Sequence, residues 1–174
     1  FEPFCAAVKQ RGAAIFVHAL RPAGQERIVG AFPEQAVAFP GDIALAAASM
    51  ITGGIAARHP ELRMAFSHGG GGLFMLLPRL DHAWNMVPKA KESIPETPTA
   101  YARRFFYDAL VFSPLGIRFL ADTYGVSQLM VGSDYPFAMG DKDPLGTLQK
   151  TGLGPDVVAA ITSGNARRFL RIAS

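Results

Sequence analysis

The sequence predicts an α/β fold in which parallel strands alternate with helices. Four short apolar segments bounded by turn residues are typical of buried parallel strands: residues 13–18, 63–68, 106–111 and 128–134. Helical segments separate them, and strand, crossover helix and parallel strand repeated in this order place a helix layer over a parallel sheet. The composition agrees, because 49% of the 174 residues are hydrophobic and only 18% are charged, as in chains that bury a core.

Five helices are expected around these strands, at residues 3–10, 42–58, 73–84, 114–124 and 155–170. Gly41-Asp42 and His59-Pro60 mark the start and the stop of the second helix, and the last two begin with a proline in the first turn. Residues 89–98 are expected to form a surface loop, because prolines stand at 88, 95 and 98. An open doubly wound sheet and a part of a closed barrel both fit this order of elements.

Composition and charge exclude several classes of protein. The uncharged stretch at residues 43–57 is shorter than the roughly 20 apolar residues that span a bilayer, so no membrane segment is expected. The net charge is +3, but the basic residues are scattered, which argues against nucleic acid and leaves small anionic substrates open. The single Cys5 excludes an internal disulfide and fits a reducing cytoplasm. The chain does not begin with Met, so further sequence is expected upstream of it.

Three of the four expected strands end in a side chain that can bind a metal or transfer a proton: His18, His68 and Asp134. The C-terminal ends of parallel barrel strands share one face, so these side chains should converge. Imidazole and carboxylate together suit Zn²⁺ and similar ions. A lone histidine is more often a buried, hydrogen-bonded core residue, but three such residues at equivalent strand ends favour a site. Asp108, in the third strand, is expected to meet a base or a backbone donor, because burying an unpaired carboxylate is costly.

The run from His68 to Gly72 lies between a strand and a helix, where four glycines let the backbone approach a ligand and turn sharply. A His-Gly-Gly-Gly run also occurs in the oxyanion loop of lipases and esterases. That interpretation requires a downstream Gly-x-Ser-x-Gly nucleophile motif, which this sequence lacks. The run is therefore interpreted as part of the predicted metal site.

Several motifs together resemble one enzyme family. They are Phe16-Val17-His18, Ser49-Met50-Ile51-x-Gly53-Gly54, His59-Pro60-Glu61-Leu62, Ser67-His68-Gly69-Gly70-Gly71, Phe106-Tyr107-x-Ala109-Leu110, Gly132-Ser133-Asp134-Tyr135-Pro136-Phe137 and Gly164-Asn165-Ala166. In this order they are similar to the C-terminal half of amidohydrolase-2 enzymes of the amidohydrolase superfamily, among them the aminocarboxymuconate-semialdehyde decarboxylases. The similarity is collinear over nearly the whole chain.

The resemblance implies the C-terminal half of a TIM (β/α)₈ barrel, with residues 1–174 forming the C-terminal part of a single barrel domain. Such a barrel has about 250 residues, and the family's His-x-His pair on the first strand is absent here, so strands one to four are expected upstream. It further implies that His18 and Asp134 bind the metal, most simply Zn²⁺ with Mn²⁺ as the alternative. His68 resembles the catalytic acid/base, with Asp134 beside it as the second catalytic residue. Arg79 resembles an arginine that contacts the substrate carboxylate, sometimes across a dimer interface, and Phe137 is expected to line the substrate pocket.

Three functions follow from these expectations. The first is a cytoplasmic, metal-dependent decarboxylase of a small unsaturated or aromatic carboxylic acid, active as a homodimer or higher homo-oligomer. The second is a hydrolase of a lactone, ester or amide on the same scaffold, because the residues of this half serve both reactions. The third is an inactive truncated fragment, because two protein ligands hold zinc poorly.

Overall fold

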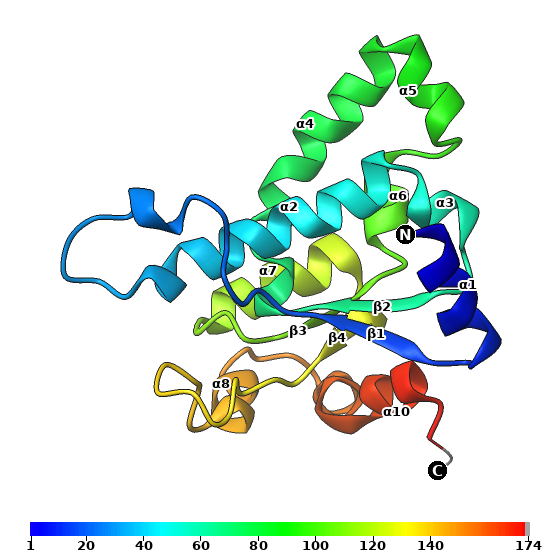
Figure 1. The fold of residues 1–174 in the computed structure, drawn as a ribbon. Coiled ribbons are helices and arrows are strands. Elements are labelled where there is room, and N and C mark those ends of the chain that lie inside the picture. Colours follow the sequence, from blue (N-terminus) through cyan, green and yellow to red (C-terminus); the bar gives the residue numbers. More distant parts are fainter. Residues whose placement is uncertain (173–174) are drawn as a thin grey trace.

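The computed structural model describes residues 1–172, and a parallel four-stranded sheet lies at its centre (Figure 1). The strands are β1 (Ala14–Val17), β2 (Arg63–Phe66), β3 (Phe106–Asp108) and β4 (Leu129–Met130), and their spatial order is β1-β2-β3-β4. Ala14 is in register with Arg63, Ala65 with Phe106, and Tyr107 with Leu129. A doubly wound sheet reverses its strand order at a switch point, whereas a barrel wall keeps sequential order. The sequential order is that of part of a (β/α)₈ barrel wall.

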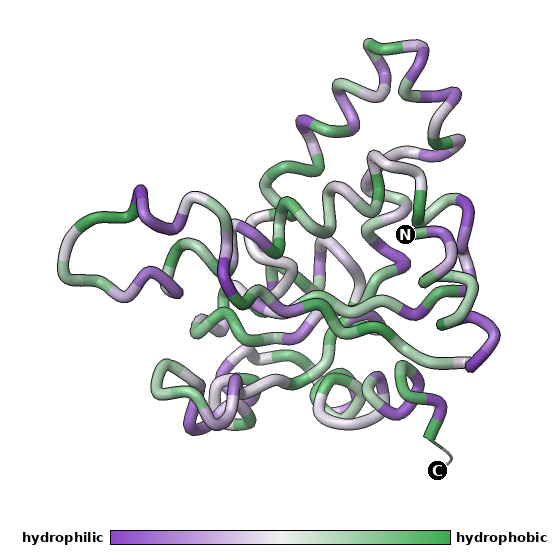
Figure 2. The backbone as a smooth tube through the Cα atoms, viewed as in Figure 1, coloured by the Kyte–Doolittle hydropathy of each residue, from purple (hydrophilic) through white to green (hydrophobic). Residues whose placement is uncertain are grey.

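Alternate strand residues divide between two hydrophobic clusters, which is why the strands are mostly apolar, with Arg63 and Asp108 as the charged exceptions (Figure 2). Met64, Phe66, Tyr107 and Leu129 belong to the larger cluster under the helices. On the opposite face, Ala65, Phe106 and Met130 pack with Phe169 in a small second cluster. Phe16 also lies on that face and is 51% exposed, so part of this face is open in the described chain.

Ten α-helices are described in residues 1–172, and several cover one face of the sheet. They are α1 (Glu2–Gln10), α2 (Ala38–Thr52), α3 (Ile55–Arg58), α4 (Leu73–Met86), α5 (Pro88–Ser93), α6 (Pro98–Ala102), α7 (Pro114–Tyr124), α8 (Pro144–Gln149), α9 (Pro155–Ala159) and α10 (Asn165–Leu170). Figure 1 shows α2, α4, α6 and α7 above the sheet and α8 and α10 below it. The α4–α5 pair projects from the body, and residues 20–37 form an extended excursion with two short 3₁₀ turns, Gln25–Arg27 and Glu34–Ala36.

One helix prediction and one loop prediction were wrong in detail. The helix expected at residues 42–58 begins at Ala38 and breaks after Thr52, because Gly54 adopts a left-handed conformation (φ 73°) that separates α2 from α3. The loop expected at residues 89–98 is largely helical, because Pro88 and Pro98 occupy the first positions of α5 and α6. The helix at 114–124 has its predicted bounds, and the one at 155–170 contains a π-helical turn between α9 and α10.

The strands are shorter than predicted, most of all β4. Of the expected 128–134 segment only Leu129 and Met130 pair in the sheet. The backbone N–H of Val131 donates instead to the carbonyl of Ile161, 2.9 Å away, so the chain leaves the ladder there. Asp134 consequently lies in a loop beyond β4 and not at the last residue of a strand.

One helical run in the described chain, Glu34–Thr52, is long and apolar enough to cross a membrane by length and composition alone. Ile43, Ala44, Ala47 and Ile51 of this run are buried, and most of them belong to the main core cluster. One face of the run therefore packs in the core of this fold.

Candidate active site

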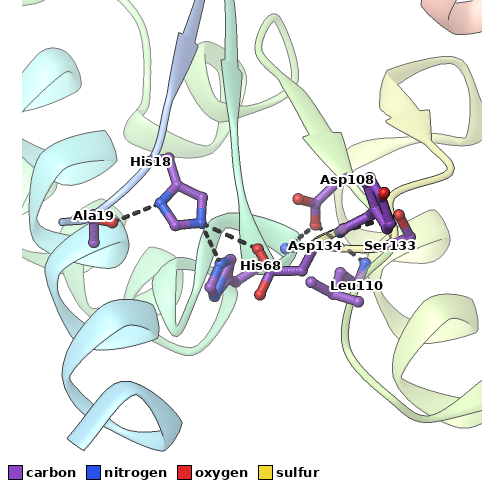
Figure 3. Close-up of polar contacts among 9 residues, drawn as sticks. His18, Ala19, His68, Asp108, Leu110, Ser133 and Asp134 are labelled. Carbon is purple, nitrogen blue, oxygen red and sulfur yellow. Dashed lines mark hydrogen bonds and ion pairs between the residues drawn. The ribbon is translucent and has the colours of Figure 1, made fainter. Parts of the chain in front are cut away.

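Three strand-end side chains converge, as predicted, at one edge of the sheet (Figure 3). His18 directly follows β1, His68 lies two residues beyond β2, and Asp134 follows β4. The Nε2 atoms of His18 and His68 are 3.2 Å apart, and His18 Nε2 lies 3.4 Å from Asp134 Oδ1. One possible ligand atom from each residue lies within 4.8 Å of the others.

The backbone at this cluster is unusual in two places. His68 and Asp134 both have positive φ values, 57° and 61°, which L-residues with side chains rarely adopt. Left-handed residues with a Cβ persist only where the surroundings hold them, and such positions concentrate at functional sites. The turns that orient the His68 and Asp134 side chains are therefore held in place by the surrounding structure.

The donor set fits a divalent cation. His18 Nδ1 lies 2.5 Å from the carbonyl oxygen of Ala19, which can only accept, so the proton is on Nδ1 and the Nε2 lone pair faces the cluster. Two imidazole nitrogens and one carboxylate oxygen are ligands that Zn²⁺ and Mn²⁺ accept. Burial lowers the pKa of His68, and His18 lowers it further, whereas Asp108 and Asp134 raise it. His68 is therefore available as a neutral imidazole to bind a cation or accept a proton.

A cavity of about 640 Å³ opens beside the cluster, within the range of small-molecule sites. Its wall is mostly apolar and comes from three segments, at residues 33–40, 110–112 and 137–139. Phe39 meets the His18 ring edge-on with centroids 5.8 Å apart, and Phe137 is stacked with it at 6.5 Å. The cavity is therefore a mostly apolar space bordered by the His18, His68 and Asp134 side chains.

The predicted site residues are not all in this cavity. His18, His68, Asp134 and Phe137 line it. Arg79 does not: it is exposed on α4, outside the described lining. Trp84 lies along a separate small cavity beside α5 and donates its indole N–H to the carbonyl of Ile94 at 2.9 Å.

Sequence reasoning missed the wall of the cavity. Phe39, Phe112 and Met139 line it and were not predicted. Phe112 and Met139 follow β3 and β4, and Phe39 lies between β1 and β2, so the rule that the loops after barrel strands build the site could have found these segments. The rule would not have found which side chains turn inward. Asp108 is buried and accepts backbone N–H groups, in agreement with its prediction.

The fold and this cluster together define one half of a (β/α)₈ barrel that carries candidate metal ligands where its strands end. The family model described as amidohydrolase matches residues 1–172, and the chain belongs to this family. It is 34% identical over 134 residues to 2-amino-3-carboxymuconate-6-semialdehyde decarboxylase of Dictyostelium discoideum, an alignment that covers 76% of this chain and 37% of that protein.

Solved structures agree on the fold. The crystal structure of 5-carboxyvanillate decarboxylase from Sphingomonas paucimobilis matches with a TM-score of 0.86 and 25% identity, over 99% of this chain and 53% of the other. Dihydroxybenzoic acid decarboxylase from Polaromonas sp. JS666, solved with bound manganese and 2-nitroresorcinol, matches with a TM-score of 0.82 and 20% identity, over 98% and 53% of the two chains. The chain thus spans about half the length of these relatives or less.

Proposed function

We propose that this chain is the C-terminal half of a divalent-metal-dependent decarboxylase that acts on a small unsaturated or aromatic carboxylic acid without a redox cofactor. The observation that carries the proposal is the convergence of His18, His68 and Asp134 at the mouth of an apolar cavity. The Dictyostelium and Sphingomonas relatives are both named as decarboxylases, which favours this reaction over hydrolysis.

In this proposal His18 and Asp134 hold the ion, and a His-x-His pair from an upstream half completes its coordination. Two protein ligands are too few for a stable zinc site, which usually has three or four. A bound divalent ion would supply Lewis-acid stabilisation of negative charge that develops on the substrate. Zn²⁺ is the first candidate, and Mn²⁺ is the alternative, supported by the manganese in the Polaromonas structure.

The remaining residues supply proton transfer and desolvation. His68, neutral at rest, takes a proton from solvent and donates it to the ring or alkene carbon as the bond to the carboxylate breaks, so that CO₂ leaves and the carbon keeps a hydrogen. His68 is then neutral again for the next turnover. Phe39 and Phe137 flank the His18 ring and exclude water, which strengthens electrostatic interactions with the substrate carboxylate.

We further propose a homodimer or higher homo-oligomer, because the described cavity wall contains no arginine or lysine. Arg79, exposed on α4, is free to contact the substrate carboxylate in the site of a second copy. Mixing an Arg79→Ala protein with a His68→Asn protein would restore part of the activity if subunits exchange and share sites. The lone buried Cys5 supports a reducing cytoplasm as the compartment.

The test uses the protein expressed with its complete upstream sequence and screened against unsaturated and aromatic acids for CO₂ release. Release of CO₂ is expected, whereas ring-opened or de-esterified products would identify a hydrolase. Metal analysis should find about one ion per chain. His18→Ala and Asp134→Ala should each lose the ion, whereas His68→Asn should keep it and lose turnover. Unchanged metal content in both ligand variants would refute the proposed metal site.

Residues 1–174 expressed alone should be poorly soluble or oligomeric and inactive. The outer edges of β1 and β4 have no strand partner in the described chain, and Phe16 lies on an open sheet face. Unpaired edges and open apolar surface both promote association. A monomeric, metal-loaded and active fragment would refute the half-barrel proposal and leave a complete small enzyme in its place.

A further inference from the structure

A buried carboxylate at the end of β3 has no part in the reaction proposed above. Asp108 is 6% exposed, and none of the salt bridges described in residues 1–172 includes it. Its Oδ1 atom accepts two backbone N–H groups, from Gly69 at 3.0 Å and from Leu110 at 3.1 Å (Figure 3). Both partners belong to segments that border the cavity. Burying a carboxylate that has only backbone hydrogen-bond partners costs free energy. A structural role for Asp108 would explain why this residue is present.

The first of these bonds acts on the turn that presents His68. Residues His68, Gly69, Gly70 and Gly71 all have positive φ values, of 57°, 62°, 74° and 61°. Glycine adopts this conformation readily, but His68 does not, so the turn must be held from outside itself. The N–H that Asp108 binds belongs to Gly69, the residue directly after His68. This bond therefore fixes the peptide that joins the strained histidine to the rest of the turn.

The same side chain also touches the segment that leads to Asp134. A Cβ atom added to Gly132 would lie 2.8 Å from Asp108 Cβ, so the two backbones are packed closely at this point. On its other side, the Leu110 N–H bond ties Asp108 to the segment that contributes Leu110, Val111 and Phe112 to the cavity wall. One side chain therefore contacts the segments that follow β2, β3 and β4.

We propose that Asp108 is a positioning residue that orients His68 by holding the Gly69 N–H, and that this role requires its acceptor oxygen and not its negative charge. The consequence for turnover rests on the proposed function, whereas the effect on the turn does not. Asparagine keeps a carbonyl oxygen at the Oδ1 position, because both N–H groups bind that one atom. Valine has a similar size and no acceptor.

The experiment compares Asp108→Asn with Asp108→Val in the full-length, metal-loaded protein. Hydrogen exchange of the Gly69 amide is followed by NMR in glycine-labelled protein without substrate, and kcat and KM are measured for CO₂ release. Asp108→Asn should keep Gly69 protected. Because it removes the negative charge that raises the pKa of His68, it should also move the pH dependence of kcat to lower pH, while the pH-independent kcat stays near wild type. Asp108→Val should speed exchange by at least about tenfold and lower kcat by about 100-fold, as misplacement of a reacting group does, with little change in KM.

A matched control separates this role from loss of a carboxylate in general. Asp81, half-buried on α4, accepts the backbone N–H of Thr99 at 3.0 Å away from the cavity. Asp81→Val should lower stability and leave kcat unchanged. If Asp108→Val does not fold, Gly132→Ala serves instead, because its new Cβ pushes Asp108 away and should likewise deprotect Gly69.

Two results would overturn the proposal. Wild-type exchange and kcat in Asp108→Val would show that the turn holds itself. An Asp108→Asn protein as slow as Asp108→Val would show that the charge is what matters. If the wild-type protein releases no CO₂ from any acid, the proposed function fails, while the exchange data still decide whether Asp108 holds the turn.

Discussion

Gly71, the last residue of the His68 turn, provides a sharp test of how tightly the site is packed. A Cβ at this position would lie 1.9 Å from the carbonyl oxygen of Pro40 and 3.1 Å from the backbone nitrogen of Ala44, both in the first turns of α2. Its φ is 61°, which disfavours any side chain. The neighbouring Gly72 has a φ of −92° and open space around its Cβ position. Gly71→Ala and Gly72→Ala therefore form a matched pair.

The expected cost for Gly71→Ala has two parts. The φ of 61° with a ψ of −127° is a sparsely populated conformation that costs an alanine about 1–3 kcal/mol, and displacing backbone atoms in a packed interior costs about 1–3 kcal/mol more. The sum is about 2–6 kcal/mol of unfolding free energy. Gly72 is the N-cap of α4, where alanine in place of glycine costs less than about 1 kcal/mol.

Equilibrium urea unfolding of the two variants in the full-length protein measures this difference. Because Phe39 and Pro40 line the cavity, Gly71→Ala should also raise KM for the substrate while Gly72→Ala leaves it unchanged. Unfolding free energies within about 0.5 kcal/mol of each other would refute the argument. Such a result would mean that α2 shifts to make room for the added methyl group, and that packing does not require glycine at this position.

Three further predictions concern the same region and its support. Asn165→Ala should cost about 2–4 kcal/mol in urea unfolding, because Asn165 Nδ2 donates to the carbonyls of Val126 at 2.9 Å and Leu129 at 2.7 Å; a cost near zero would mean that water replaces it. Ser67→Ala should leave stability unchanged or slightly raised, because its buried hydroxyl has no partner among residues 1–172, and a marked loss in the full-length protein would reveal a partner upstream. Burial lowers the pKa of His68, so the unfolded chain binds more protons, and stability of the metal-free protein should fall as pH drops through about 6.5. His68→Gln should flatten that pH dependence in urea unfolding, and an unchanged slope would contradict the assignment.

The cluster of His18, His68 and Asp134 could be predicted because it depends on topology and not on detail. An apolar strand followed at once by a histidine is visible in the sequence, and the parallel order then brings the strand ends to one edge. The predicted end of β4 was wrong by several residues, but the predicted cluster was still correct. The loop after β4 brings Asp134 to the same edge of the sheet as His18 and His68.

The cavity wall could not be predicted in this way. Phe39 contacts His18 because the start of α2 packs on the His68 turn, and that packing depends on Gly71 being small enough to admit Pro40. Such packing follows from contacts between distant segments, which local patterns do not encode. The break after Thr52 is different, because the adjacent Gly53 and Gly54 are a local signal for a turn that the sequence prediction did not use.

The sequential parallel order of the sheet also has a consequence for how the chain folds. Each strand can pair with the next strand only after the connection between them has been synthesised. Ala14 therefore cannot pair until Arg63 has been made, and Ala65 cannot pair until Phe106 has been made. At about 5–20 residues per second of synthesis, β1 emerges from the ribosome some seconds before β2 can pair with it. During that interval the edge of Ile15, Phe16 and Val17 that pairs with β2 has no partner, so slow, non-local pairing exposes this apolar edge to chaperones and to aggregation.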